Sequence, residues 1–222
     1  MPSPELPDFA AIASLPGARL DELALAIAAE FRSVSAQATL DELDELGAEL
    51  ANAQPDSPRK QAEACRRLLG ERERFTGNRD DYDHPDNSML DLVLARRKGL
   101  PILLSVVYLE VARRARIPLE GVGLPGHYVV GHFGTQPPLL LDPFAGGAEF
   151  ALPTGVPPAL VRPWGSHETA LRMLHNLTGT YATRGDLGRA IHAARLRLLL
   201  PLDDLNRETL NLELRRLEAR LN

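Results

Sequence analysis

The feature that most constrains the fold is an apolar segment near the middle of the chain. From Leu100 to Ala112 nearly all residues are apolar, and Pro101 stands at the beginning of the segment. Proline is favoured at the first position of a helix, and apolar side chains on nearly all faces indicate burial on most sides. The segment is too short to cross a bilayer, which needs about 20 apolar residues. We therefore predict a central buried helix that starts at Pro101, and no association with a membrane.

Amphipathic helices are predicted before this segment. Apolar residues recur at helical spacing over 20–31 and again over 40–50. Ser57 and Pro58 are typical of the start of a third helix, in which the serine would cap the first free amides. Residues 1–17 contain four prolines and lack the helical period, so a flexible arm is expected there.

A polar loop and one further helix are expected between the third helix and the central one. Residues 75–85 are polar and contain glycine and proline without any period, which is typical of a loop. Asn87 or Ser88 is expected to cap the next helix, since Asp91 follows Ser88 at the spacing of a capping box. Gly99 is expected to end that helix.

The pattern changes from helical to strand-like after the central helix. Val122, 128–130 and 139–141 are predicted to lie in short strands, because glycine and proline turns separate them. The fold class is therefore α+β, with N-terminal helices, a central buried helix and a small antiparallel sheet in one unit over 18–165.

Residues 166–222 form a separate helical tail in this prediction. Apolar residues at helical spacing predict a hairpin that is broken at Gly185 and ends before Pro201. Its spacing approximates one tetratricopeptide unit of about 34 residues. A last amphipathic helix, over 207–221, would cap the hairpin or mediate self-association as a homodimer.

The charge balance argues against a nucleic-acid partner. The chain has 30 acidic and 25 basic side chains and a net charge of -5, so it offers no broad positive surface for phosphates. Its single cysteine, Cys65, excludes an internal disulfide, and no signal peptide is recognisable at the N-terminus. A cytoplasmic location is expected from these features.

One long segment of the chain resembles a known family. The runs are FTGNRDDYDHPDNSMLDLVLARRKGLPILLSVVYLEVARRARIPLEGVGLPGHYVVGHF and, further on, LLLDPFAGG. They resemble the SirB-type family of transglutaminase-like bacterial proteins, and RMLHNLTGTYATRGDLGRA resembles the tetratricopeptide-like tail of that family. The resemblance implies a papain- and transglutaminase-like core in a bacterial cytoplasmic protein. It implies no established substrate, although such proteins are sometimes described as invasion regulators.

The wider superfamily uses a cysteine thiolate at a helix N-terminus, a histidine on a following strand and an acid that orients the histidine. A buried helix, His127 and Asp142 occur here in that order. The Ile117-Pro118 pair resembles the residues at which this helix ends in the superfamily. Counting back from the pair places the cysteine that the resemblance implies at Pro101, which has no nucleophilic group. We expect Cys65 to be buried in a different helix and inert.

The missing thiol favours a noncatalytic binding module. We expect a pocket around His127 and Asp142 that includes Pro101, Gly126 and Asn87. A protein or peptide partner would bind in this pocket or in the groove of the hairpin.

Two alternatives remain open from the residues alone. Ser105, one turn after Pro101 on the same helix face, would act with His127 and Asp142 in an amide or ester hydrolase or acyltransferase. The other alternative is a structural or oligomerising protein, in which the histidine and aspartate only stabilise the fold.

No metal or other cofactor is expected. Four aspartates surround His84 over 80–86, but their spacing lacks the glycine and the glutamate of a calcium loop. His127 and His132 are five residues apart on a predicted strand, so their side chains would point to opposite faces. Capping and solvation are the expected roles of the four aspartates.

Overall fold

The central helix forms as α6, Pro101–Arg114, in the computed structural model, which describes residues 7–53 and 55–220. Pro101 is the first helical residue, and every residue over 101–108 is buried. Because proline lacks an N–H and has its φ fixed near helical values, it begins the helix without losing a hydrogen bond. The prediction of a buried central helix is confirmed.

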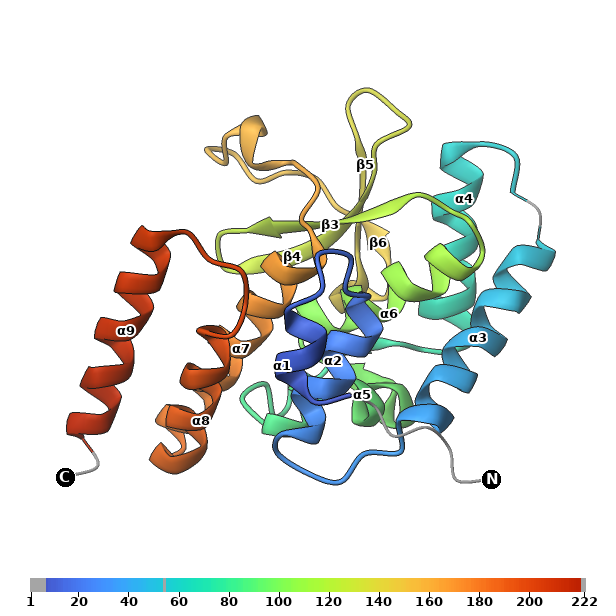
Figure 1. Cartoon of the computed structure of the whole chain (residues 1–222). Coiled ribbons are helices and arrows are strands. Elements are labelled where there is room, and N and C mark those ends of the chain that lie inside the picture. The colour runs from blue at the N-terminus through green and yellow to red at the C-terminus, as the bar shows by residue number, and fades with distance from the viewer. Residues whose placement is uncertain (1–6, 54, 221–222) are drawn as a thin grey trace.

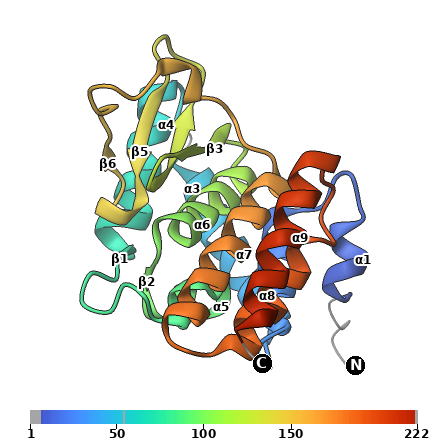
Figure 2. The ribbon, with the colours of Figure 1, turned by 90° about the vertical axis from the view of Figure 1, so that its left-hand side faces the viewer.

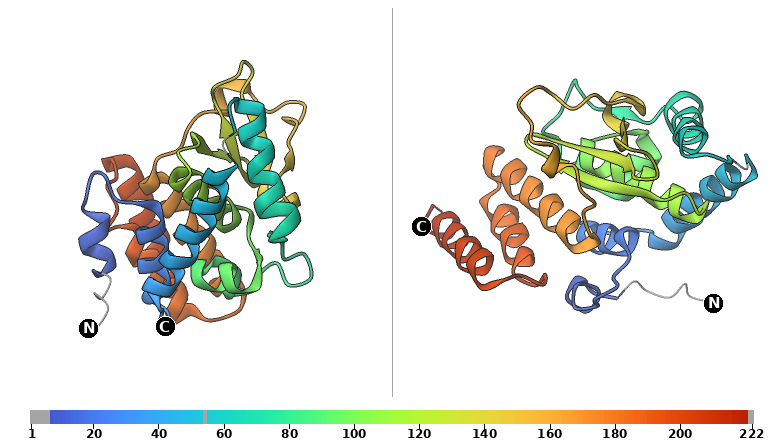
Figure 3. Two further views of the ribbon diagram at one scale, coloured as in Figure 1. Left: turned by 90° about the vertical axis from the view of Figure 1, so that its right-hand side faces the viewer. Right: turned by 90° about the horizontal axis from the view of Figure 1, so that it is seen from above.

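A four-stranded antiparallel sheet covers α6, in the order β3 (Leu119–Leu124), β4 (His127–His132), β5 (Leu139–Asp142) and β6 (Ala148–Glu149). Tyr128 and Val130 join the main core with α6, whereas Val129 belongs to a second cluster on the opposite face. Segment 150–161 packs against that second cluster (Figures 1 and 3). The α+β class with a small antiparallel sheet is confirmed.

The helices before the core are α1 (Phe9–Ala13), α2 (Leu20–Ala29), α3 (Ala36–Asn52) and α4 (Pro58–Cys65), and α4 continues as a π-helical segment over Arg66–Arg72. The structure differs from the predicted flexible arm over residues 9–13, which form α1. Phe9 and Ile12 of this helix are buried in the core, and Asp8 caps it. Burial of two large apolar side chains offsets the entropy lost on ordering. Residues 1–6 of that expected arm lie outside the described residues.

The connection to α6 contains two short strands and α5 (Leu90–Arg96). The strands β1 (Thr76–Gly77) and β2 (Lys98–Gly99) pair in parallel, so the expected loop is held beside the start of α6. The predicted caps are wrong in detail: Met89 precedes α5, because Asn87 and Ser88 lie in a 3₁₀ turn, Pro85–Ser88. The Ser57 side chain likewise makes no capping bond to the described amides of α4.

The C-terminal helices are α7 (Ser166–Thr183), α8 (Leu187–Arg197) and α9 (Asp204–Ala219). Gly185 has a positive φ of 79° in the turn between α7 and α8, as the predicted break requires. The helix α9 begins three residues before the predicted start, where Asp203 accepts a hydrogen bond from the Asn206 amide. Figure 2 shows the three helices side by side, with α8 in contact with both others. The predicted hairpin is confirmed as a pair of helices.

A buried ionic network ties α2 to α6. Asp21 is fully buried, and one of its oxygens accepts hydrogen bonds from Arg19 at 2.6 Å and Arg114 at 2.8 Å. Arg114 also donates to Glu110 at 2.8 Å, and it forms a further ion pair with Asp44 of α3. Because charges removed from water are costly unless they are paired, these side chains depend on one another.

Gly70 permits a close backbone approach, and its replacement tests this packing. A methyl group on Gly70 would lie 1.9 Å from the carbonyl oxygen of Gly146, so the turn would have to shift. We expect Gly70→Ala to lower the free energy of unfolding by about 1–3 kcal/mol. The matched control is Gly179→Ala, in the open interior of α7, which should raise it by up to about 1 kcal/mol. Urea unfolding measures both, and equal effects would contradict the close approach.

Candidate functional site

His127 and Asp142 form a pair at one end of the sheet. The Nε2 atom of His127 lies 3.0 Å from Oδ2 of Asp142, and Oδ1 of Asp142 accepts a hydrogen bond from the Phe144 amide at 2.9 Å. The two side chains are 23% and 15% exposed, so both reach solvent. Since an ionised carboxylate only accepts, Nε2 carries the proton in the neutral imidazole. Nδ1 then presents its lone pair, as a hydrogen-bond acceptor or a base.

Local structure explains the position of this pair. Leu124 lies opposite His127 in the β3–β4 hairpin, whose two-residue turn contains Gly126 with a φ of 70°. The Val130–Leu141 register brings the end of β5, and so Asp142, next to the start of β4. The predicted neighbour Gly126 is exposed, and nothing lies within 4 Å of the position that its Cβ would take. The space beside Gly126 is therefore open.

Aromatic and cationic side chains lie around the imidazole, and they were not among the predicted site residues. The ring centroids of Phe150 and Phe144 lie 5.5 and 6.5 Å from that of His127. Tyr82 packs edge-on against Phe144 at 5.9 Å, and the Arg79 guanidinium lies 4.8 Å from the centroid of the same ring. The DPF run after the predicted strand was the available signal for Phe144. These groups could give a ligand both apolar and charged contacts.

Arg172 of α7 holds the turn that carries His127. Its Nη2 atom donates to the carbonyl oxygens of Leu124 at 3.2 Å and of His127 at 3.5 Å. The C-terminal helices therefore contribute a positive charge next to the pair, which sequence periodicity alone could not indicate.

Asn87 and Pro101 do not line an open pocket, contrary to the expectation. Both are buried, and the Asn87 amide donates to the carbonyl oxygens of Asp81 at 2.6 Å and Tyr82 at 3.0 Å. Its side-chain oxygen accepts from the side-chain amide of Asn78 at 3.0 Å, and its backbone carbonyl oxygen accepts from the backbone amide of Leu100 at 3.1 Å. Asn87 therefore fastens the loop over 78–82 to the start of α6, because a buried amide must satisfy its donors and acceptor.

The structure does not bring Ser105 to the imidazole. Ser105 is fully buried in α6, and its hydroxyl donates to the carbonyl oxygen of Tyr128 at 3.5 Å. That contact is with the backbone of β4, and no hydrogen bond joins Ser105 to His127 within the described parts of the chain. The Ser105–His127–Asp142 arrangement is therefore incomplete at its nucleophile.

Cys65 is at the end of α4 and is fully buried, as predicted. Burial raises the pKa of its thiol to about 12. Because the thiolate is the reactive form, Cys65 is almost entirely unreactive near neutral pH.

The acidic loop is engaged by ion pairs. Asp81 lies 3.8 Å from Arg184, and Asp86 lies 3.1 Å from Arg96. Nδ1 of His84 accepts a hydrogen bond from the amide of Asp86 at 3.2 Å. Across residues 7–53 and 55–220, no group of three or more His, Cys, Asp or Glu side chains is arranged to hold a metal ion.

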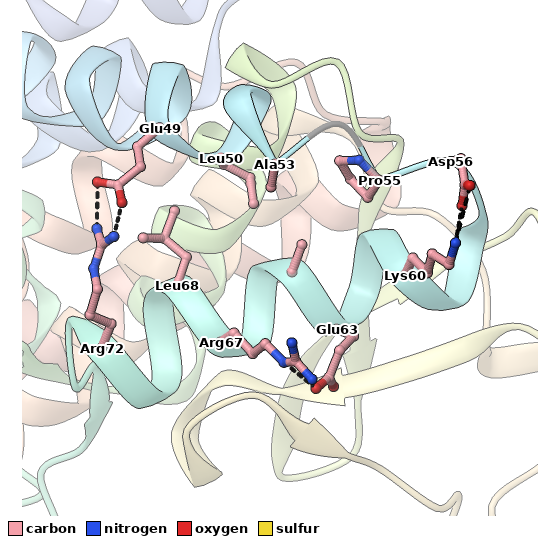
Figure 4. A pocket seen from close by; sticks show the side chains of 11 residues that line it. Glu49, Leu50, Ala53, Pro55, Asp56, Lys60, Glu63, Arg67, Leu68 and Arg72 are labelled. Atoms are coloured by element: carbon pink, nitrogen blue, oxygen red, sulfur yellow. Dashed lines mark hydrogen bonds and ion pairs between the residues drawn. The ribbon is translucent and has the colours of Figure 1, made fainter.

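A cavity of about 630 Å³ lies between α3 and α4, away from His127 (Figure 4). Its charged side chains pair with one another, as in the Glu49–Arg72, Asp56–Lys60 and Glu63–Arg67 ion pairs. Because these charges are already compensated, this cavity offers no clear selectivity for a ligand.

Comparison with known proteins places the site in a family context. Residues 37–154 match the sequence profile of the transglutaminase-like superfamily, and this range includes the buried helix, the histidine and the aspartate. No solved structure matches the chain. Within the part that the structure describes, no helix has the length and apolar character needed to cross a membrane.

Curated relatives include proteins of bacteria and of mammals. A UPF0162 protein of Xylella fastidiosa is 37% identical over 155 residues, which are 62% of this chain and 55% of the relative. The UPF0162 protein of Pseudomonas aeruginosa is 38% identical over 130 residues, which cover 57% and 47%. F-box only protein 21 of the mouse is 41% identical over 68 residues, which are 31% of this chain and 11% of that protein. The chain spans about half the length of the UPF0162 relatives it matches.

Proposed function

The chain belongs to the transglutaminase-like superfamily, and from this membership we propose that it is a noncatalytic member that binds a protein or peptide partner at the His127–Asp142 pair. The observation that supports this proposal is that the pair is intact and reaches solvent, while its imidazole has no nucleophilic side chain hydrogen-bonded to it among the described residues. A superfamily reaction would require such a group, because the imidazole acts by taking a proton from it.

The surroundings of the pair are suited to recognition. Nδ1 of His127 would accept a hydrogen bond from a peptide N–H, and the rings of Phe150 and Tyr82 would contact apolar side chains. Arg79 and Arg172 add positive charge, which favours a partner with acidic groups. The SirB-type subgroup, the tetratricopeptide-like character of the tail, the cytoplasmic location and a homodimer remain predictions.

Selection of peptides from a phage-displayed library on the immobilised protein tests this function. Selected peptides should bind His127→Ala at least about tenfold more weakly, because the variant loses the acceptor and its ring contacts. Asp142→Asn should weaken binding less, because the imidazole is still present and only the carboxylate that orients it is lost. The matched control is His132→Ala on the same strand, whose Nε2 bonds Gln61 and not Asp142. Binding would be measured by fluorescence anisotropy.

Two outcomes would contradict the proposal. The first is labelling of the wild type by a fluorophosphonate probe that disappears in Ser105→Ala, which would establish a serine-dependent enzyme. The second is that His127→Ala lowers the melting temperature while no peptide binds the wild type, which would leave a structural role. Light scattering on the same samples would then test self-association.

A further inference from the structure

A second cavity lies among the C-terminal helices. Its volume is about 280 Å³, and residues of α7, α8 and α9 line it. The helices α7 and α9 both pack against α8 (Figure 2). Arg197, in the last turn of α8, lines the cavity together with residues of the two outer helices. Ala182 of α7 and Leu217 of α9 contribute apolar surface to the same cavity.

Arg197 is a buried cation with unused donors. Its side chain is 1% exposed, and its Nη1 atom donates to Glu213 at 2.8 Å and lies 3.4 Å from Nδ1 of His175. Its Nε and Nη2 atoms are buried and have no partner among the residues that the structure describes. A buried guanidinium normally uses its planar set of donors on acceptors, and leaving them unpaired is costly. We therefore expect an acceptor for these donors that is not part of the described chain.

The charges around the cavity favour an anion. Arg216 of α9 and Arg220, which directly follows this helix, also line it, and neither forms an ion pair with any residue within 7–53 or 55–220. Glu213 is the one carboxylate in the lining, against three guanidinium groups. Burial and the nearby Arg197 lower the pKa of His175, so His175 is neutral at pH 7 and adds an acceptor but no charge. An excess of two positive charges remains, since three cations face one anion.

We propose that this cavity binds a carboxylate of a peptide ligand, with a neighbouring apolar side chain against Ala182 and Leu217. Glu213 already accepts from Nη1 of Arg197, and the ligand carboxylate would pair with Arg216 or Arg220. A turn of the Arg197 side chain toward the cavity would bring its buried, unused donors to the same carboxylate. The volume lies just below the range of about 300–1,000 Å³ typical of whole small-molecule ligands. One or two peptide residues therefore fit better than a cofactor. This site does not depend on the His127–Asp142 pair.

Fluorescence anisotropy with short labelled peptides tests the proposal. The probe is a hexapeptide that carries an uncharged BODIPY dye at its amino end, ends in leucine with a free carboxylate and has no acidic side chain. A second peptide has an amidated end and an internal Glu-Leu pair, and a third is the amidated peptide without any acid. We expect the first or the second to bind and the third to bind at least about tenfold more weakly, because one charge-assisted contact is lost. The first two peptides distinguish a terminal carboxylate from a side-chain carboxylate.

Substitutions in and directly after α9 test which charged side chains bind the peptide carboxylate, and they leave the buried Arg197 in place. Arg216→Gln combined with Arg220→Gln should weaken the binding peptide about tenfold, whereas Arg215→Gln, an exposed neighbour outside the cavity, should not. Glu213→Gln should tighten binding severalfold, because it removes the competing carboxylate, and a purely structural role would not produce a gain. His127→Ala should leave this affinity unchanged, which separates the result from the proposed function.

The proposal is overturned if the acid-free peptide binds as well as the others, or if no peptide binds at concentrations of about 1 mM, where even weak complexes form. Equal losses in the Arg216/Arg220 double variant and in Arg215→Gln would overturn it as well. Thermal unfolding of each variant confirms that the compared proteins are folded.

Discussion

Pro101→Cys is expected to create a thiol that iodoacetamide alkylates at least roughly a hundredfold faster than Cys65 at pH 7. Pro101 is buried, as Cys65 is, but the new side chain would stand at the first position of α6, where unpaired amides lower a thiol pKa below about 8.5. The imidazole, in the register that the resemblance implies, would lower it further by stabilising the thiolate. Cys65, by contrast, has a pKa of about 12 because it is buried. Mass spectrometry of the alkylated peptides measures both rates in one sample.

Two further variants show whether this reactivity depends on the proposed register. Adding His127→Ala to Pro101→Cys should slow alkylation about tenfold or more, because the imidazole no longer stabilises the thiolate. The matched control is Ser105→Cys, one turn deeper in α6 at a fully buried position, which should react slowly. Similar rates for the two new thiols would show that Pro101 does not occupy the nucleophile position.

Asp21→Asn is expected to lower the free energy of unfolding by about 3–5 kcal/mol, the range for breaking a buried ion pair. The substitution keeps the shape of the side chain but removes the charge that accepts from Arg19 and Arg114. Arg114, whose side chain is 9% exposed, would then keep one buried carboxylate, that of Glu110. Urea unfolding at pH 7 gives the loss, and Glu22→Gln, a partly exposed neighbour on α2, should cost less than about 1 kcal/mol.

The pH dependence of this effect follows from the direction of the Asp21 pKa. Burial alone would raise that pKa, but hydrogen bonds from Arg19 and Arg114 outweigh burial and hold it below 3.8. A carboxyl whose folded-state pKa is lowered stabilises the fold above its unfolded pKa, and this stabilisation is lost as the pH falls through the folded value. The difference between wild type and Asp21→Asn should therefore shrink below about pH 4. A constant difference down to pH 2 would contradict the ionic role of Asp21.

Local signals accounted for most of the elements. The apolar run after Pro101, the glycine break at Gly185 and the apolar run of β4 between its turns each depend on neighbours within a few positions. The order of helix, His127 and Asp142 could likewise be read along the chain, and these two side chains meet at 3.0 Å. Such features are predictable because helical and strand periods reflect which face of a segment is buried.

Roles that depend on distant partners were not predictable in the same way. Asn87 is a residue type that often caps helices, yet its side chain donates hydrogen bonds to carbonyl groups of the loop. Ser105 lies on a plausible face of α6, yet its hydroxyl contacts the backbone of Tyr128. Both outcomes follow from the need of a buried polar group to find a partner, and that partner lies far away in sequence.

The sequence by itself therefore determined the buried helix and the strands that follow it, because these are properties of residue type and spacing. That Pro101 stands where the superfamily has its thiol remains a prediction. Only the tertiary structure decided that α1 packs into the core, that Arg172 reaches the turn of His127, and that Arg197 lies buried between α7 and α9. The physical reason is that burial and the pairing of charges depend on which distant parts of the chain come into contact. Several sequence patterns are compatible with each such contact, so the local pattern does not identify the partner.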